Sequence, residues 1–164
     1  MLTIIAACDK NRLIGMDGQI PWSCTADLQQ FRKRTLGQTV IMGRSTWESI
    51  GQTPLVERNN IVVTSKAADI HLYGVTFAPN LLAALREARK FPGKEIFIIG
   101  GEQLYKEAMP LADTIILTRV DKTITQKGRD LRYFPEINNQ KWELVILEQW
   151  DGYRIEEYHR TGFT

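Results

Sequence analysis

Short apolar runs alternate with longer amphipathic stretches along this chain. Thr3–Cys8 (T-I-I-A-A-C) is typical of a buried strand, whereas Leu81–Phe91 has helical spacing of its apolar residues and an N-cap candidate in Asn80. Strands that alternate with helices favour parallel β-α-β units. The sequence therefore predicts an α/β fold with a mixed, mostly parallel central sheet and helices on both faces.

The predicted elements continue in this order along most of the chain. Strands are predicted at Thr3–Cys8, Gln38–Met42, Asn60–Thr64, Val75–Ala78, Glu95–Ile99, Ala112–Val120, Lys141–Gln149 and Gly152–Thr161, with the weakest near Leu131–Phe134. Helices are predicted at Ala26–Arg34, Arg44–Ile50, Leu81–Phe91 and from Gly100-Gly101 to about Met109, and Asp9–Ser23 is predicted to be a loop. The last third has no helix pattern, so we expect its strands to be antiparallel and to lie at one edge of the sheet.

The 164 residues favour a single domain over 1–164. A formal net charge of +2 is too small to indicate nucleic acid or a membrane surface as partner. Two cysteines and two histidines support neither a zinc site nor a disulfide scaffold. The chain has no signal-peptide pattern, and no apolar run approaches the ~18 residues of a membrane span. We expect a reduced, cytoplasmic protein that acts on a small molecule.

Asp27 is the first candidate for chemistry. It lies in the first turn of a predicted helix, beside the apolar positions Leu28 and Phe31. A carboxylate on an apolar surface can pair with the N–H and amino groups of a flat heterocycle, and burial there shifts its pKa. An acid is also favoured at a helix N-terminus without any ligand. On position alone, this structural explanation outweighs the functional one.

Two glycine turns between a strand and a helix are candidates for phosphate binding. In Val40–Gly51, Gly43 allows close backbone approach, and the amides of Arg44, Ser45 and Thr46 suit an anion. An ordinary turn capped by Ser45 explains this segment equally well. Ile98–Tyr105 repeats the pattern with Gly100-Gly101, although the G-x-G-x-x-G fingerprint of dinucleotide-binding folds is absent.

Two such turns in one α/β domain fit a pyrophosphate held between two helix ends. Thr64-Ser65-Lys66 follows another predicted strand and, with Arg44, could bind a further phosphate. That phosphate would favour NADPH over NADH. The remaining reactive residues, Cys8, Cys24, His71 and His159, are interpreted as structural, and no metal site is predicted.

Taken together, these segments closely resemble dihydrofolate reductases of the bacterial chromosomal type over nearly the whole chain. The matching pieces are I-A-A at 5–7, L-I-G-M at 13–16, P-W at 21–22, A-D-L at 26–28, V-I-M-G-R-S-T-W-E-S-I-G at 40–51, I-I-G-G at 98–101, L-T at 117–118 and F-P at 134–135. Their order and spacing carry the resemblance. It makes a functional role for Asp27 the favoured interpretation.

The resemblance implies NADPH-dependent reduction of 7,8-dihydrofolate to tetrahydrofolate, in a monomer that binds antifolate inhibitors. It implies catalytic roles for Asp27, which pairs with the pterin and promotes its protonation, for Thr118, which fixes that carboxylate, and for Trp22, which helps to hold a water. The implied substrate-binding residues are Ile5, Asp27, Leu28, Phe31, Arg32, Ile50, Leu55, Arg58, Ile99 and Thr118, with Arg58 on the glutamate carboxylate.

The implied cofactor-binding residues fall into four segments of the chain. They are Ala7, Leu13, Ile14, Gly15, Met16, Asp17, Gly18 and Gln19; Gly43, Arg44, Ser45 and Thr46; Thr64, Ser65 and Lys66; and Ile99, Gly100, Gly101, Glu102, Gln103, Leu104 and Tyr105. Leu13–Gln19 is expected to belong to a loop over the nicotinamide, and the peptide between Gly100 and Gly101 is expected to be cis.

The chain departs from the family pattern at a few positions. Glu57 stands where glycine is usual, Glu102 replaces a third glycine, and Ser45 replaces a frequent histidine. We expect Ile20, Cys24 and a longer 121–133 loop to alter antifolate affinity. Two alternatives stay open: a related reductase acting on a ribosylaminopyrimidine, and a non-catalytic nucleotide- or folate-binding module.

Overall fold

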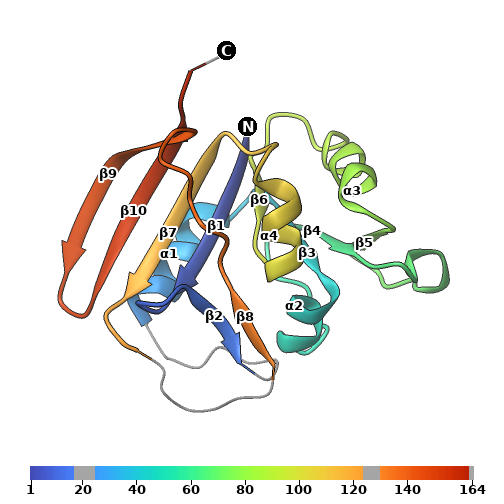
Figure 1. Cartoon of the computed structure of the whole chain (residues 1–164). Coiled ribbons are helices and arrows are strands. Elements are labelled where there is room, and N and C mark those ends of the chain that lie inside the picture. Colours follow the sequence, from blue (N-terminus) through green and yellow to red (C-terminus); the bar gives the residue numbers. More distant parts are fainter. Residues whose placement is uncertain (17–24, 124–129, 163–164) are drawn as a thin grey trace.

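The computed structural model describes residues 1–16, 25–123 and 130–162. The strands of its main sheet are β1 (Leu2–Cys8), β3 (Thr39–Gly43), β4 (Asn59–Val63), β5 (Val75–Ala78), β6 (Ile96–Ile98), β7 (Thr114–Val120), β9 (Trp142–Trp150) and β10 (Tyr153–Arg160). They lie in the order β5-β4-β3-β6-β1-β7-β10-β9 (Figure 1). The first six in this order pair in parallel, whereas β10 pairs antiparallel with both β7 and β9. The prediction of a mostly parallel mixed sheet is confirmed.

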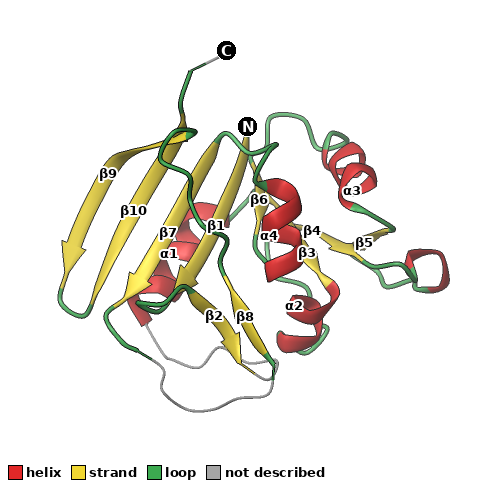
Figure 2. Ribbon diagram, viewed as in Figure 1, coloured by secondary structure: helices red, strands yellow, loops and turns green. Residues whose placement is uncertain are grey.

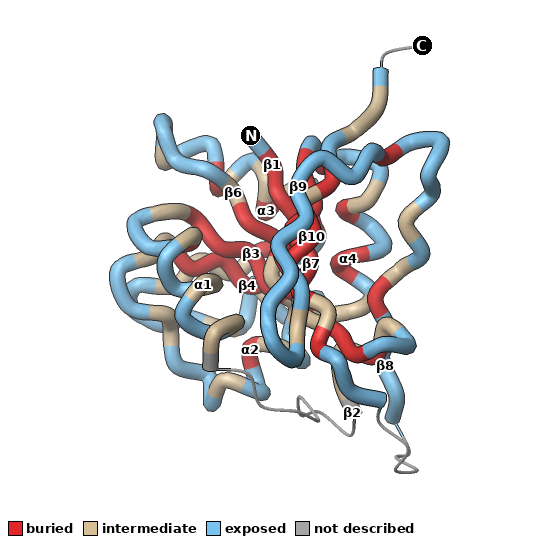
Figure 3. Tube along the Cα trace, turned by 90° about the vertical axis from the view of Figure 1, so that its left-hand side faces the viewer, coloured by how far each residue is buried: buried red, intermediate tan, exposed pale blue. Residues whose placement is uncertain are grey.

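Helices cover both faces of this sheet (Figure 2). They are α1 (Thr25–Thr35), α2 (Arg44–Ser49), α3 (Leu81–Ala88) and α4 (Glu102–Ala108), with a 3-10 turn, η1, at Ala67–Asp69. In Figure 3, α1 and α4 lie on opposite sides of the strands. The predicted cap of α3 is confirmed, because the Asn80 side chain accepts a hydrogen bond from the Ala83 amide at 2.8 Å.

The parallel strands are apolar on both faces because helices cover both. Along β1, Ile4 and Cys8 belong to the core cluster that includes α3 and α4. Ile5, which points the other way, belongs to a second cluster with Trp47 of α2, against which Phe31 of α1 packs. The period of two along each strand therefore divides the core into two layers, one on each side of the sheet.

The predicted helix over Leu81–Phe91 ends earlier than expected, at Ala88. Pro92 disfavours helical backbone in the residue before it. The amides of Lys90 and Phe91 accordingly bond to carbonyls three residues back, at Glu87 and Ala88. The chain thus leaves the helix through a tight turn although the apolar pattern continues.

Two predictions about strands are corrected. The segment Asp9–Ser23, predicted to be a loop, contains strand β2 (Leu13–Met16), which pairs antiparallel with β8 (Leu131–Tyr133) in a separate two-stranded sheet. Strand β7, expected to be antiparallel with the rest of the last third, is parallel to β1. The reason is that α4 provides the crossover that returns the chain in the same direction.

Candidate functional site

The predicted site residues gather at one edge of the main sheet. Ala7 and Thr118 lie near the carboxyl ends of β1 and β7, and Gly43 ends β3. Thr64 and Gly100 follow β4 and β6 within two residues. Because these five strands are parallel, their carboxyl ends meet at the same edge, which is where ligands bind in open α/β sheets.

The central pair of this edge is Asp27 on α1 and Thr118 on β7. Thr118 lies opposite Ala7 of β1 and Ile155 of β10, and it is buried. Its side chain hydrogen-bonds to the Asp27 carboxyl group. Burial raises the pKa of Asp27, and the hydrogen bond from Thr118 lowers it by less, so the net direction is upward. The carboxyl group therefore takes up a proton more readily than an exposed aspartate.

An apolar surface adjoins this pair. Four of the side chains predicted to line the substrate site pack against one core cluster while staying partly exposed: Phe31, Ile50, Leu55 and Ile99. Ile5 lies inside the same cluster, and Leu28, next to Asp27, is 60% exposed. A helix that turns one apolar side chain outward beside a half-buried carboxyl group provides a surface for a flat, partly apolar ligand.

Arg58 lies close to Arg32, at the side of the site predicted to bind the glutamate carboxylates. Its Nε donates to the Val56 carbonyl at 2.9 Å and its Nη1 to the Thr35 hydroxyl at 3.3 Å. Burial and the positive charge of Arg32 lower the pKa of Arg58, and Glu57 opposes them. Two neighbouring guanidinium groups repel each other, and a bound anion relieves that repulsion.

The backbone just before Arg58 explains one departure from the family pattern. Glu57 has a φ of 60°, in the left-handed region that favours glycine. Its carbonyl accepts a hydrogen bond from the Gly37 amide at 2.8 Å, which ties this loop to the end of α1. The loop thus keeps a conformation suited to glycine although its residue is glutamate.

The two glycine turns, far apart in sequence, are in direct contact. The Gly43 amide donates to the Gly100 carbonyl at 2.8 Å, and the peptide between Gly100 and Gly101 is cis, as expected. A Cβ on Gly100, whose φ is 124°, would stand 3.2 Å from both the Thr46 and the Tyr105 hydroxyl oxygens. Close approach and backbone conformation therefore both require glycine there.

The polar residues around these turns are mostly accessible. Ser45, Ser65 and Lys66 are exposed, and the Thr64 hydroxyl accepts a hydrogen bond from the Lys66 amide at 3.3 Å. Arg44, also exposed, pairs through its Nε with Glu48 at 2.8 Å. Cationic and hydroxyl groups thus lie beside the backbone turns, an arrangement suited to phosphate oxygens.

The other predicted cofactor residues divide into an exposed and a buried group. Gln103 is exposed, whereas Leu104 and Tyr105 are buried beneath the turn. The Tyr105 hydroxyl donates to the Ile5 carbonyl at 2.9 Å, and burial followed by the charge of Asp27 raises the pKa of that hydroxyl. Tyr105 therefore supports the turn and β1 from below.

Strand β2 carries the next group of predicted cofactor residues. Leu13 is buried, and Ile14 and Gly15 are partly exposed. The predicted residues Asp17, Gly18, Gln19 and Trp22, together with Ile20 and Cys24, lie outside the described residues. Met16 is placed by its pairing with Leu131.

Sequence reasoning missed a buried charge cluster on the opposite face of β7 and β10. Glu156 is 4% exposed, and its carboxylate contacts Arg119 Nε at 2.6 Å, Arg154 Nε at 3.0 Å and the Tyr158 hydroxyl at 2.9 Å. Nearby Cys8 is buried, which raises the pKa of its thiol to about 12. The thiol thus stays protonated at neutral pH, as its structural interpretation predicts.

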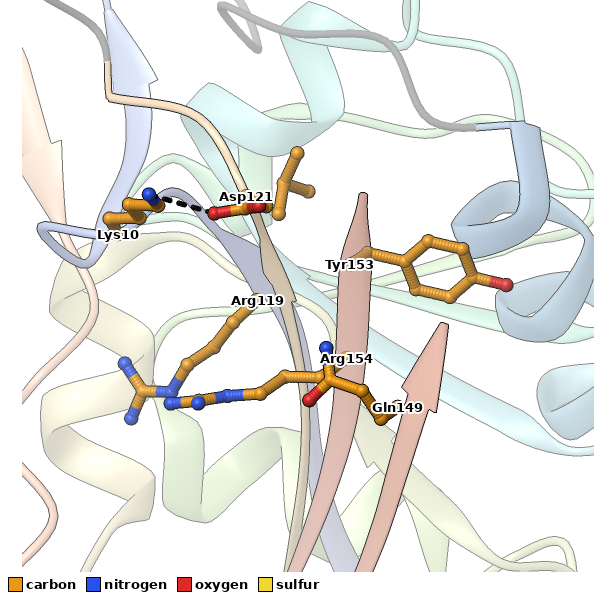
Figure 4. A pocket seen from close by; sticks show the side chains of 7 residues that line it. Lys10, Arg119, Asp121, Gln149, Tyr153 and Arg154 are labelled. Carbon is orange, nitrogen blue, oxygen red and sulfur yellow. Dashed lines mark ion pairs between the residues drawn. The ribbon is translucent and has the colours of Figure 1, made fainter. Parts of the chain in front are cut away.

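A cavity of about 310 Å³ adjoins this cluster (Figure 4). Arg119 and Arg154 extend alongside each other into it, while Lys10 pairs with Asp121 at 2.8 Å and the Tyr153 ring points away. Its cationic side chains are thus engaged by carboxylates of the chain itself. The cluster joins Arg119 near the end of β7 to Arg154, Glu156 and Tyr158 of β10.

Within 1–16, 25–123 and 130–162, His, Cys, Asp and Glu side chains form no group of three or more placed to bind a metal ion. No helix among these residues is long and apolar enough to cross a membrane.

Comparisons with known proteins agree on one family. A family model described as dihydrofolate reductase matches residues 1–161. A dihydrofolate reductase of Bacillus subtilis (strain 168) is 43% identical over 149 residues, covering 91% of this chain and 84% of that protein. A type 3 dihydrofolate reductase of Salmonella typhimurium is 45% identical over 143 residues, covering 87% and 83%.

A solved structure shows the same arrangement of elements. It is dihydrofolate reductase from Enterococcus faecalis complexed with NADP(H) and RAB-propyl. It is similar to this chain with a TM-score of 0.86 and 33% identity, covering 99% of this chain and 97% of that one.

Proposed function

Because the chain belongs to the dihydrofolate reductase family, we propose that it reduces 7,8-dihydrofolate to 5,6,7,8-tetrahydrofolate, with one NADPH and one proton consumed per turnover. The observation that carries the proposal is the Asp27 carboxyl group, hydrogen-bonded to buried Thr118 beside a partly exposed apolar surface. This environment suits a flat heterocycle. The N–H groups of the heterocycle can donate to the carboxyl group, and its ring can pack on the apolar side chains.

Asp27 acts as the catalytic residue that binds the pterin and favours its protonation. Its carboxyl group accepts hydrogen bonds from the amino group and ring N–H of the pterin. Its raised pKa, caused by burial, lets it retain a proton at higher pH than an exposed carboxyl group. Thr118 donates to the carboxyl group and thereby sets the direction from which Asp27 meets the ligand.

Phe31, Ile50, Leu55 and Ile99 contact the apolar parts of the substrate and exclude water from the reacting ring. Arg58, oriented by the Val56 carbonyl and the Thr35 hydroxyl, binds a carboxylate of the glutamate tail. Arg32 contributes a second positive charge to the same end of the substrate.

The edge of the sheet also fits NADPH. The Gly43 amide donates to the Gly100 carbonyl at 2.8 Å, which brings the two glycine turns together, and phosphates can lie against their backbone. Ser45, Thr46, Ser65 and Lys66 provide hydroxyl and cationic groups beside it. When bound, the nicotinamide supplies the hydride that reduces the pterin. Ala7 and Ile14 of this chain contact the nicotinamide side of the cofactor.

The proposal is tested by following dihydrofolate-dependent NADPH oxidation with the wild type and with Asp27→Asn. We expect the variant to lose at least about 100-fold in kcat/KM at neutral pH, the range by which a positioned acid or base contributes. Asp69→Asn, which removes an exposed carboxylate on η1, is the matched control and should keep wild-type activity.

Two outcomes contradict parts of this proposal. A wild-type protein that binds NADPH but reduces no dihydrofolate favours the non-catalytic binding module. An Asp27→Asn variant with unchanged kcat/KM removes Asp27 from the mechanism and leaves the reaction itself intact.

The proposal extends to a monomer that acts in the cytoplasm and is inhibited by antifolates. An inhibitor with amino and ring N–H groups arranged as in the pterin competes for Asp27 and for the apolar side chains beside it. The exposed position of Leu28 supports inhibitor binding, because it leaves the face of α1 beside the Asp27 carboxyl group accessible.

A further inference from the structure

The side chain of Glu102 extends from the glycine turn to strand β8. Glu102 is the first residue of α4 and directly follows Gly101. One carboxylate oxygen, Oε2, accepts a hydrogen bond from the Tyr133 amide at 3.0 Å, and the other, Oε1, accepts one from Lys106 Nζ at 3.0 Å. Only 18% of this side chain is exposed. Both oxygens are therefore engaged by the protein, away from the backbone of the turn.

The strand that Glu102 contacts belongs to a short ribbon. Leu13 of β2 pairs with Tyr133, and the register shifts before Gly15 pairs with Arg132. A two-stranded ribbon of this length is marginal on its own and requires support from other parts of the molecule. At one end, the Arg12 carbonyl accepts from the Phe134 amide at 2.7 Å. Glu102 provides support from α4.

The hydrogen bond to Tyr133 is made by a charged acceptor. Burial alone would raise the pKa of Glu102, but the hydrogen bonds from Lys106 and the Tyr133 amide, with the charges of Lys106 and Arg132, lower it overall. The carboxylate is thus ionised at neutral pH. Hydrogen bonds to ionised acceptors are shorter and stronger than those between neutral groups.

We propose that Glu102 is a positioning residue that joins the cofactor turn at Gly100-Gly101 to the β2–β8 ribbon. Through this link it holds Ile14 of β2 in its position at the cofactor site. Glu102 contacts neither substrate nor cofactor in this role. It acts through Tyr133 and the pairing of β8 with β2. The inference rests on the proposed NADPH-dependent reaction for its functional consequence but not for its structural one.

Three variants separate the contributions of the carboxylate. Glu102→Ala removes both hydrogen bonds, whereas Glu102→Gln keeps a carbonyl oxygen for the Tyr133 amide. Lys106→Met removes the ion pair with Glu102 and leaves the bond to Tyr133. A difference between Glu102→Ala and Lys106→Met therefore reports on the link to β8.

The first measurement is amide hydrogen exchange of the ligand-free protein. In Glu102→Ala we expect exchange in Leu13–Met16 and Leu131–Tyr133 to accelerate by about tenfold or more, the change that follows from losing a charge-assisted hydrogen bond. Lys106→Met should keep wild-type exchange, and Glu102→Gln should lie between wild type and alanine.

The second measurement is the NADPH Kd together with kcat and the dihydrofolate KM. Glu102→Ala should lower kcat and raise the Kd of NADPH several-fold, with the dihydrofolate KM little changed and with partial rescue by glutamine. The inference is overturned if exchange in the two strands is unchanged in Glu102→Ala. It is also overturned if both Glu102 variants bind NADPH more tightly, because the carboxylate would then act by repelling phosphate.

A failure of the proposed reaction is distinguishable from a failure of this inference. If the wild type oxidises no NADPH with dihydrofolate, the reaction is wrong, and the exchange data still decide whether Glu102 supports the ribbon.

Discussion

Asp27 shows how the surroundings of a residue change its acidity. In the first turn of a helix, an aspartate is favoured by the helix dipole whether or not it binds a ligand. Here the carboxyl group is also half-buried and accepts a hydrogen bond from Thr118 on a neighbouring strand. The two influences on its pKa are opposed, and burial is the larger. The hydrogen bond from Thr118 is the smaller influence, and removing it tests whether Thr118 acts on Asp27.

We expect Thr118→Val to move the descending limb of the pH profile of kcat/KM toward higher pH. Valine fills the same volume but donates no hydrogen bond, so the pKa of Asp27 should rise further above its usual range. The control is Thr114→Val on the same strand, at the opposite end of β7. An unchanged profile in Thr118→Val would mean that the hydroxyl group does not act on the Asp27 carboxyl group.

The elements that form the cofactor side of the site meet at the two glycine turns. Helices α2 and α4 each begin directly after one of these turns, and the turns are joined by the hydrogen bond from Gly43 to Gly100. Thr46 of α2 and Tyr105 of α4 both lie against Gly100. Helix α2 thus packs through Thr46 on the turn that precedes α4, and α4 packs on the same turn through Tyr105.

Gly100→Ala should disrupt this junction much more than the same change at Gly37. Both glycines have positive φ, but nothing lies within 4 Å of a Cβ on Gly37. We expect Gly37→Ala to lower the free energy of unfolding by about 1 kcal/mol, for backbone conformation alone. Gly100→Ala adds steric overlap and should cost about 2–5 kcal/mol and weaken NADPH binding. Equal losses in denaturant titrations of the two variants would contradict the packing described.

At the scale of the whole molecule, strand β9 forms one edge of the main sheet. Strand β9 is exposed over most of its length (Figure 3). Four consecutive apolar residues, Leu144–Leu147, are each 42–54% exposed there. An apolar edge strand with free backbone groups is a template for pairing with other chains. Strand β10 lies between β9 and β7, the nearest of the parallel strands.

Placing lysine at Leu144 and Leu147 should reduce aggregation without loss of activity. Charged side chains on an edge strand oppose intermolecular pairing. Light scattering during heating should begin at higher temperature in the double variant than in the wild type, and sedimentation should show a monomer. Leu82→Lys, at a 62% exposed position on α3, is the matched control and should leave the scattering unchanged. Equal effects of the two changes would mean that surface charge, not the edge, governs aggregation.

Local sequence patterns predicted most of the secondary structure because the spacing of apolar residues reflects which residues are buried and which are exposed. The apolar run at Thr3–Cys8 and the periodic stretch that starts at Leu81 appear as β1 and α3. Strand β2 was missed since its four residues have no distinctive alternation and its partner β8 lies far along the chain. Glu156 was missed because a glutamate in an alternating strand is normally exposed, and its arginine partners come from β7 and β10.

Part of the candidate site was likewise predicted from the sequence, and part became visible only in the structure. Sequence motifs predicted turns before helices at Gly43 and Gly100-Gly101, which the structure shows, and the resemblance to a family led to the prediction of a functional role for Asp27. Three contacts are known only from the folded chain: the one between Gly43 and Gly100, the hydrogen bond from Thr118 to Asp27, and the hydrogen bond from the Tyr133 amide to Glu102. Periodicity depends on neighbours three or four residues apart, whereas each of these contacts joins segments whose proximity exists only after the sheet has formed.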